Sequence, residues 1–374
     1  MDSNEIKYTI ALSNLPGVGL ATARLLITAL GSATAVWENR NCIKDALPDA
    51  SKRLTEAMGG MDDAVRLAEK ELEFITTKNI KVLCLGDESY PARLLECDDA
   101  PLVMFTLGNT NFNAEHIISI VGTRRCTQYG KELCQSLVEG IKQQCPDTLI
   151  VSGLAYGIDI CAHRAALSCG LPTVGVLAHG LDRIYPAVHR HTAVQMLNQG
   201  GLLTEYVSGT TPERNNFVRR NRIVAGMSDA TVVVESAARG GSLITAELAS
   251  AYNRDVYAVP GRIFDEFSAG CNKLIAEQRA SLIQSADDLL IQLGWMQPKA
   301  KPSTIQQELF VELTPLQQTI VDTLKGVDDK QINQIVIETG LPYSQVSSQL
   351  YELECQGIVI LLGGARYKLR NKRI

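Results

Sequence analysis

The sequence predicts an α/β protein whose central feature is a doubly wound, mainly parallel β-sheet. Short apolar runs rich in β-branched residues recur through the middle of the chain, and stretches with helical spacing separate them. Buried parallel strands have this character when glycines bound them. The predicted strands are residues 117–121, 148–151, 173–177, 231–234 and 256–259. Segments of a different character on either side predict further domains.

Residues 1–75 are expected to form an all-helical domain. Apolar residues recur at helical spacing on both sides of a Leu-Pro-Gly-Val-Gly turn at residues 15–19, a pattern typical of helix-hairpin-helix or SAM-like domains. In a helix-hairpin-helix, the glycine turn presents backbone N–H groups to a DNA phosphate. Only Lys7 and Arg24 are basic before residue 40, so a structural or weakly assisting role is favoured.

Residues 76–296 contain the predicted strands and are expected to form an extended Rossmann-like domain. A proline- and lysine-containing linker is predicted at residues 297–312. Residues 313–374 then show three helical stretches and two short strands around a Gly-Gly turn, which is the pattern of a winged-helix domain.

The third of these helical stretches, residues 344–355, would be the DNA-recognition helix of a winged-helix domain. It contains Glu352 and Glu354 but no Lys or Arg, whereas recognition helices normally bring cations to DNA. A module for contact with protein is therefore favoured, assisted by the basic stretch at residues 366–373. A sequence-specific regulator acting through this domain remains an alternative.

The composition fits a chain of two or three domains that stays in the cytoplasm. No run of about 18 apolar residues could span a membrane, and the acidic, polar N-terminus lacks the pattern of a secretory signal. The ten cysteines form no Cys-x-x-Cys pair and do not cluster with the five histidines, so we expect free thiols and no metal site. A net charge of −5 restricts any nucleic-acid site to a local basic patch.

Four segments are expected to meet at the edge of the sheet where parallel strands end and ligands bind. The first contains Gly122, Arg124, Arg125 and Thr127. Glycine allows close approach of the backbone to a ligand, and Thr127 can cap the following helix or donate to a phosphate. A phosphate contact is favoured over an ordinary strand-to-helix turn. The Gly-x-Gly-x-x-Gly fingerprint is absent, so NAD and FAD are disfavoured and no cofactor is expected.

The second segment contains Ser152 and Gly153 and leads into a helix. Asp159 and His163 lie four residues apart on one face of that helix. Neither a nucleophile nor a metal ligand accompanies them, so a structural contact between the two is favoured over a catalytic acid–base pair.

The third segment combines arginines with an aromatic residue. Its members, all within nine residues, are Arg214, Phe217, Arg219, Arg220, Asn221 and Arg222. This combination suits single-stranded nucleic acid, because guanidinium groups bind phosphates and an aromatic ring stacks on bases. In an acidic chain it is favoured over a helix whose arginines pair with acidic neighbours.

The fourth segment, with Gly241 and Ser242, precedes a helix and could present backbone amides to an anion. Together the four segments predict a continuous groove for an anionic ligand.

In their order along residues 76–296, these segments resemble the DprA/Smf family of DNA-processing proteins. The matching stretches are Gly-Thr-Arg at 122–124, Ser-Gly-Leu-Ala-Tyr-Gly-Ile-Asp at 152–159, Gly-Leu-Asp at 180–182, Tyr-Pro at 185–186, Arg-Asn-Arg at 220–222, Gly-Ser-Leu-Ile-Thr-Ala at 241–246 and Ala-Val-Pro-Gly at 258–261. The chain departs from the family at Val218, where a proline is usual, and at Gly240, where a serine is usual.

The resemblance implies a protein without catalytic activity that binds single-stranded DNA, protects incoming DNA and loads the recombinase RecA during natural transformation. It implies a DNA pocket at Arg124, Ser152, Arg214, Phe217 and the Asn221-Arg222 pair. It also implies a homodimer whose contact includes Lys273, Ile275 and Leu282. The lack of a long apolar run predicts no contact with a membrane.

The main alternative is a nucleotide-processing enzyme similar to the lysine-decarboxylase-like phosphoribohydrolases. Those proteins carry Pro-Gly-Gly-x-Gly-Thr followed by a catalytic glutamate. Here Ala-Arg-Gly-Gly-Ser-Leu at 238–243 occupies a comparable position, and Glu247 follows it. The match is partial, because the proline is missing and Ser-Leu replaces Gly-Thr.

Overall fold

The computed structural model describes residues 2–48, 50–297, 313–327 and 329–369. The chain divides into two compact units, Met1–Pro298 and Lys299–Ile374, and each is described here by itself. The predicted linker lies outside the described residues apart from Gln297. None of the helices in the described part of the chain is long and apolar enough to cross a membrane.

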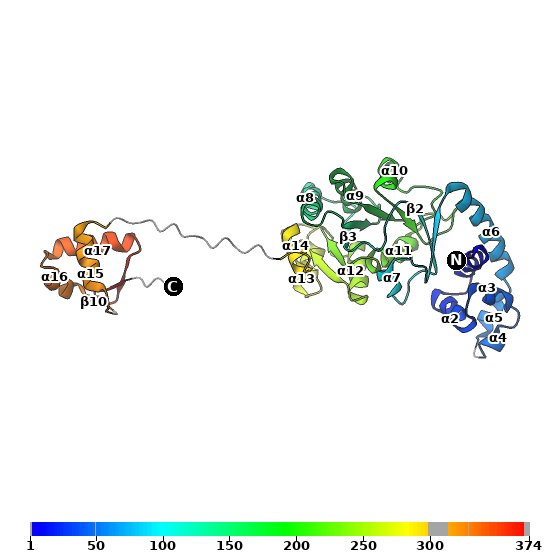
Figure 1. Ribbon diagram of the computed structural model, residues 1–374, viewed down its shortest axis with the longest axis horizontal. Helices are drawn as coiled ribbons and strands as arrows, with labels where there is room; N and C mark the ends of the chain where they lie inside the picture. The colour runs from blue at the N-terminus through cyan, green and yellow to red at the C-terminus, as the bar shows by residue number, and fades with distance from the viewer. Residues whose placement is uncertain (1, 49, 298–312, 328, 370–374) are drawn as a thin grey trace. The chain divides into compact units, whose positions relative to one another are not determined.

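The first unit begins with a group of helices (Figure 1). They are α1 (Ser3–Ser13), α2 (Leu20–Leu30), α3 (Ala33–Glu38), α4 (Ile43–Ala46), α5 (Lys52–Met58) and α6 (Met61–Lys78). Their apolar faces share one core with the first strands of the sheet, where Leu12, Leu26 and Phe105 pack together. The predicted boundary at residues 75/76 falls within α6, and this shared core joins the helices to the sheet.

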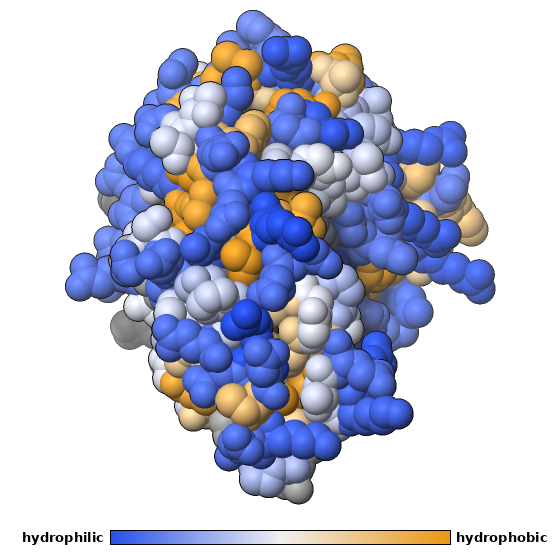
Figure 2. Space-filling model, turned by 90° about the vertical axis from the view of Figure 1, so that its right-hand side faces the viewer, coloured by the Kyte–Doolittle hydropathy of each residue, from blue (hydrophilic) through white to orange (hydrophobic). Residues whose placement is uncertain are grey.

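Figure 2 views the first unit from the side of these helices. Hydrophilic residues cover most of this face, with small hydrophobic patches between them. Leu25 in α2 and Leu67 in α6 are more than half exposed.

A nine-stranded sheet forms the centre of the first unit, with the strand order β1-β2-β6-β5-β4-β3-β7-β8-β9. The strands are β1 (Lys81–Cys84), β2 (Val103–Gly108), β3 (Ile117–Val121), β4 (Leu149–Ser152), β5 (Thr173–Val176), β6 (Gly200–Thr204), β7 (Ala230–Val233), β8 (Asp255–Ala258) and β9 (Ser281–Leu282). From β6 to β9 neighbouring strands pair in parallel, whereas β1 and β2 pair antiparallel. The predicted α/β fold with a mainly parallel sheet is confirmed.

Helices cover both faces of the sheet, because residues of each strand alternate between the two cores. In β3, Ile117 and Val121 face the core beneath α11 (Arg214–Gly226) and α12 (Gly241–Ala251). Ile118 and Ile120 face the core beneath α8 (Gln128–Gln144), α9 (Ile158–Cys169) and α14 (Ala286–Gln292). The helices of this part, including the short 3-10 helix η1, are α7 (Ala92–Leu95), α8 (Gln128–Gln144), α9 (Ile158–Cys169), η1 (Ala187–His189), α10 (Arg190–Gln199), α11 (Arg214–Gly226), α12 (Gly241–Ala251), α13 (Ala269–Ala276) and α14 (Ala286–Gln292).

The direction of strand progression reverses between β3 and β7. The chain passes from β3 through β4 and β5 to β6 on one side, and from β7 through β8 to β9 on the other. Loops leaving β3 and β7 therefore diverge at this point, which opens a crevice at the carboxyl ends of the strands.

The described residues of the second unit form three helices and a small antiparallel sheet (Figure 1). Its elements are α15 (Pro315–Leu324), β10 (Lys330–Gln331), α16 (Ile332–Thr339), α17 (Tyr343–Cys355), β11 (Val359–Leu362) and β12 (Arg366–Leu369). Ile320, Ile335 and Leu350, one from each helix, meet in its core. The sequence predicts the three helices and the two strands of the hairpin but not β10, which consists of two residues. Of the basic stretch, residues 370–373 lie outside the described residues.

Candidate functional site

A groove of about 580 Å³ opens at the reversal point of the sheet. We call it the switch-point groove. The loops after β3, β4 and β7, helix α11 as far as Val224 and the first turn of α12 line it. The predicted site residues that line it are Gly122, Arg124, Gly153, Arg214, Phe217, Arg220, Asn221, Gly241 and Ser242. The structure thus brings together residues that lie more than 100 positions apart in the sequence.

The loop after β3 is held in place by Glu235, a residue that sequence reasoning missed. Its carboxylate is buried and accepts hydrogen bonds from the backbone N–H of Thr127 (2.8 Å) and from the Thr127 hydroxyl (2.5 Å). The Thr127 hydroxyl in turn accepts from Gly130 N (3.1 Å), so Thr127 caps α8, which is one of the two roles that the sequence allowed for it. Because both partners of this hydroxyl lie inside the protein, its role here is to fix the loop. A carboxylate directly after a predicted strand was the available signal for Glu235.

Close packing explains two of the glycines near this loop. A Cβ atom at Gly122 would lie 2.4 Å from Cγ1 of Ile158, and one at Gly130 would lie 2.3 Å from Oε2 of Glu235. The two glycines therefore let the β3 loop pack against α9 and against the end of β7.

Arg124 and Phe217 form the central contact of the groove. The guanidinium carbon of Arg124 lies 4.9 Å from the centroid of the half-buried Phe217 ring, within the range of a cation–π interaction. Arg214 is exposed one turn earlier in α11, and Asn221 is partly exposed one turn later. Arg125 points elsewhere, with its guanidinium carbon 5.8 Å from the centroid of the Phe267 ring.

Arg220 is a buried residue rather than a surface cation. Its side chain donates a hydrogen bond to the Gly153 carbonyl (2.6 Å) and another to the Val176 carbonyl. Asp159 lies close by, also buried, and accepts from the backbone N–H groups of Gly153 (3.2 Å) and Ala155 (3.4 Å). Burial raises the pKa of Asp159, while the charge of Arg220 opposes this shift. Burial likewise lowers the pKa of Arg220, against the charge of Asp159.

Arg222 is buried as well and forms an ion pair with Glu205, whose carboxylate also lies 3.6 Å from Arg219. Burial raises the pKa of Glu205, and the charge of Arg222 opposes this. The four arginines of α11 therefore do not share a face. Arg214 and Arg219 reach solvent, while Arg220 and Arg222 have internal partners. Sequence reasoning missed Glu205, which follows the unpredicted strand β6.

The expected contact between Asp159 and His163 is wrong. Asp159 binds backbone N–H groups at the end of β4, whereas Nδ1 of His163 lies 2.7 Å from the hydroxyl oxygen of Thr173. One helical turn separates the two side chains, and each points to a different strand end.

Two predicted hydroxyl groups have internal partners. The Ser152 hydroxyl is fully buried and donates to the Ile120 carbonyl (2.6 Å). The Ser242 hydroxyl donates to the Ser236 hydroxyl oxygen (2.8 Å). A Cβ atom at Gly241 would meet no atom within 4 Å, so the first turn of α12 is open to the groove.

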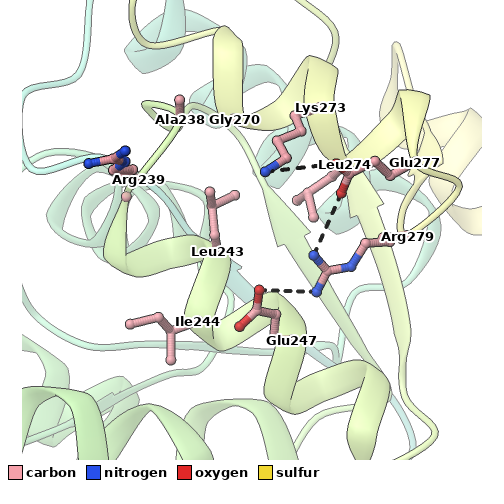
Figure 3. Close-up of a pocket in the computed structure, with 11 residues that line it drawn as sticks. Ala238, Arg239, Leu243, Ile244, Glu247, Gly270, Lys273, Leu274, Glu277 and Arg279 are labelled. Carbon is pink, nitrogen blue, oxygen red and sulfur yellow. Dashed lines mark ion pairs between the residues drawn. The ribbon is translucent and has the colours of Figure 1, made fainter.

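Glu247, the candidate catalytic residue of the enzyme alternative, lines a different pocket of about 230 Å³. Figure 3 shows Glu247 and Glu277 on either side of Arg279. The oxygen–nitrogen distances are 3.1 Å for Glu247 and 3.7 Å for Glu277. Glu247 is therefore paired with a cation outside the groove.

Of the three residues expected at a dimer contact, Lys273 lines this second pocket, whereas Ile275 and Leu282 do not. Lys273 lines it and pairs with Glu277 (3.7 Å), as Figure 3 shows. Ile275 is partly buried in α13, and Leu282 is 42% exposed on β9, the edge strand of the sheet.

Fold and groove together define a class of protein. It is a Rossmann-like α/β protein whose groove at the reversal point offers cations, an aromatic ring and a helix N-terminus to an anionic ligand. Residues 81–294 match the sequence model of the DNA recombination-mediator protein A family, and the chain belongs to this family, DprA/Smf.

A relative that aligns with the whole chain and two solved structures agree with this assignment. Protein Smf of Synechocystis is 31% identical over 402 aligned residues, covering 99% of this chain and 100% of that protein. The X-ray structure of DNA processing protein A from Streptococcus pneumoniae is 32% identical, with a TM-score of 0.64, and covers 78% of this chain and 98% of that one. DNA processing protein A from Helicobacter pylori, whose single-stranded DNA binding mode has been described structurally, is 27% identical with a TM-score of 0.52, covering 57% and 95% of the two chains.

Proposed function

We propose that this protein binds single-stranded DNA in the switch-point groove, without sequence preference and without catalysing a reaction. The observation that carries the proposal is the stacking of Arg124 on Phe217 in a groove that Arg214 also lines. A nucleotide at this position meets a guanidinium group for its phosphate and an aromatic face for its base. Such contacts reach no base edge, so binding is independent of sequence.

The buried residues of the groove have a supporting role in this proposal. Four buried side chains form hydrogen bonds to groups elsewhere in the protein rather than to solvent: those of Arg220, Asp159, Glu235 and Ser152. These bonds hold the backbone that contacts DNA in one conformation. A rigid site loses little conformational entropy when it binds a flexible strand.

We further propose that the protein protects incoming DNA and loads the recombinase RecA during natural transformation. The description of the family as recombination mediators supports this role, as does the Helicobacter pylori relative described as binding single-stranded DNA. All ten cysteines are free thiols, which agrees with action in the reducing cytoplasm.

A homodimer through the β9 edge belongs to the proposal. Leu282 on the edge strand and Lys273 on α13 are exposed, and an unpaired strand edge beside an apolar side chain is suited to a symmetric contact.

For the second unit we propose contact with a protein partner, since α17 exposes Glu352 and Tyr351 and has no Lys or Arg. For the N-terminal helices we propose an assisting role, because few cations surround the turn at Gly17.

The test is fluorescence anisotropy with a labelled oligothymidine and with a duplex of the same length. We expect tight binding to the single strand, weak binding to the duplex and large losses in Arg124→Ala and Phe217→Ala. Arg66→Ala is the matched control for the charge, since the Arg66 side chain is exposed on α6 and does not line the groove. Equal affinity for both DNA forms, or wild-type binding by both groove variants, would contradict the proposal.

A further inference from the structure

Two exposed tyrosines stand beside the groove but do not line it. Tyr156 is 47% exposed and Tyr185 is 44% exposed. The Tyr185 ring lies 5.9 Å from the Phe217 ring at an angle of 58°. Tyr156 lies in the loop that contacts the Arg124 loop, since the next residues bring Ile158 N within 3.2 Å of the Thr123 carbonyl. Tyr185 therefore lies next to the aromatic ring of the groove, and Tyr156 belongs to a loop that contacts the loop of Arg124.

A buried histidine holds the loop of Tyr156. Nδ1 of His189 lies 2.8 Å from the Leu154 carbonyl, and its ring meets the Tyr156 ring edge to face at 5.1 Å. A carbonyl only accepts, so Nδ1 carries the proton and donates it. Leu154 has a φ of 56°, an unfavourable region for leucine, and the hydrogen bond from His189 helps to hold it there.

A second buried histidine holds Tyr185 in the same manner. Nδ1 of His179 donates to the Gly180 carbonyl (2.9 Å), so its Nε2 is free to accept from the backbone N–H of Tyr185 (3.2 Å). Burial lowers the pKa of His179, which keeps the ring in this neutral, accepting form. Two buried histidines thus fix the backbone beside two tyrosines whose side chains are almost half exposed.

The charges next to these rings suit a phosphate backbone. Arg190 is exposed and directly follows His189, and Arg183 is exposed two residues before Tyr185. The carboxylate of this segment, that of Asp182, accepts hydrogen bonds from the Arg183 side chain (2.9 Å) and from Gly209 N (3.0 Å). Hydrogen bonding to these donors lowers the pKa of Asp182 despite its partial burial.

We infer that Tyr156 and Tyr185 form a second binding surface, which we call the tyrosine ledge, where bases of a single strand stack after leaving the groove. The inference rests on the proposed function and extends it, because it gives the strand a path across the loops after β4 and β5. Rigid, half-exposed aromatic rings beside arginines are what sequence-independent binding of single strands requires. In a duplex the base faces are already stacked on one another, so the ledge favours single strands.

The experiment compares a short oligothymidine of about 4 nucleotides with a long one of about 16, lengths that span the site sizes of single-strand binders. Tyr156→Ala and Tyr185→Ala are each expected to weaken binding of the long strand by about 5- to 150-fold, the range for one lost base stack. Binding of the short strand is expected to change much less. The Tyr→Phe variants keep the ring and are expected to bind as wild type.

Tyr351→Ala is the matched control, because Tyr351 is 68% exposed in the second unit. A second long strand, with abasic sites beyond its first nucleotides, removes the bases that would stack on the ledge. On that strand the tyrosine variants and the wild type are expected to be equal.

Wild-type binding of the long strand by both tyrosine variants would refute the ledge. Equal losses on short, long and abasic strands would also refute it, since they would indicate damage to the groove. Failure of the proposed function gives a different result: the wild type itself would not distinguish single strands from duplex.

Discussion

Replacement of Arg220 by Met separates a structural role from a DNA-binding role for this buried arginine. Methionine keeps the apolar part of the side chain but removes the donors to the Gly153 and Val176 carbonyls. It also leaves the buried carboxylate of Asp159 without its nearby cation. An unsatisfied buried polar group costs about 1–3 kcal/mol, and loss of one partner of a buried charge pair costs about 3–5 kcal/mol. We therefore expect the free energy of unfolding to fall by about 3 kcal/mol or more.

The assay is urea unfolding followed by tryptophan fluorescence. Both tryptophans, Trp37 and Trp295, lie in the first unit, so the signal reports that unit alone. Arg219→Met is the matched control: its side chain is 56% exposed, and Glu205 keeps its closer ion pair with Arg222, so the expected loss is about 0–1 kcal/mol.

A second substitution tests the cause of the expected loss. Asp159→Asn removes the buried charge, so the double variant Arg220→Met/Asp159→Asn should lose less stability than the sum of the two single variants. An Arg220→Met protein as stable as wild type, with reduced DNA binding as its only defect, would refute the reasoning. It would indicate that Arg220 contacts DNA rather than stabilising the fold.

Three further predictions concern stability. Gly130→Ala places a Cβ atom 2.3 Å from the fixed carboxylate of Glu235 and is expected to cost about 1–3 kcal/mol, whereas Gly241→Ala, with open space around it, should not; urea midpoints decide this. Burial lowers the pKa of His163 from 6.5 to about 3, so below pH 6.5 the unfolded chain gains a proton that the folded protein does not. Stability should therefore fall as the pH drops from 6.5 towards 3, and a slope unchanged in His163→Gln would contradict this assignment. Thr314→Ala removes the N-cap of α15 and should cost the second unit about 1 kcal/mol, seen as earlier melting of that unit by circular dichroism with no shift in the tryptophan transition.

The parallel strands could be predicted because their sequences carry the signal themselves. The runs at β3, β4, β5, β7 and β8 are apolar and β-branched, and the predicted bounds agree with the structure to within one residue. Strand β6 begins with Gly200 and Gly201 and depends on pairing with β5 and β2, while β9 has only two residues. Neither has a local pattern that distinguishes it from a loop.

The site could be predicted in outline, but the orientation of its side chains could not. The sequence brings arginines and Phe217 to one helix, yet it does not indicate which arginines face inward. That depends on Glu205 and on the Gly153 and Val176 carbonyls, which come from other parts of the sheet. Polar residues dominate the first part of α11, so hydrophobic periodicity does not reveal its buried face there. The same limit applies to Glu235, whose role appears only once β3 and β7 are neighbours.

The most direct test of the groove as the DNA site is photocrosslinking of the full-length protein to an oligothymidine carrying 5-iododeoxyuridine, with the modified peptides identified by mass spectrometry. Aromatic side chains that stack on the halogenated base are the expected crosslinking partners. The account predicts crosslinks in the peptide containing Phe217, with further ones at Tyr185 and Tyr156 as the label moves along the strand. Crosslinks confined to the N-terminal helices or to the second unit would contradict it.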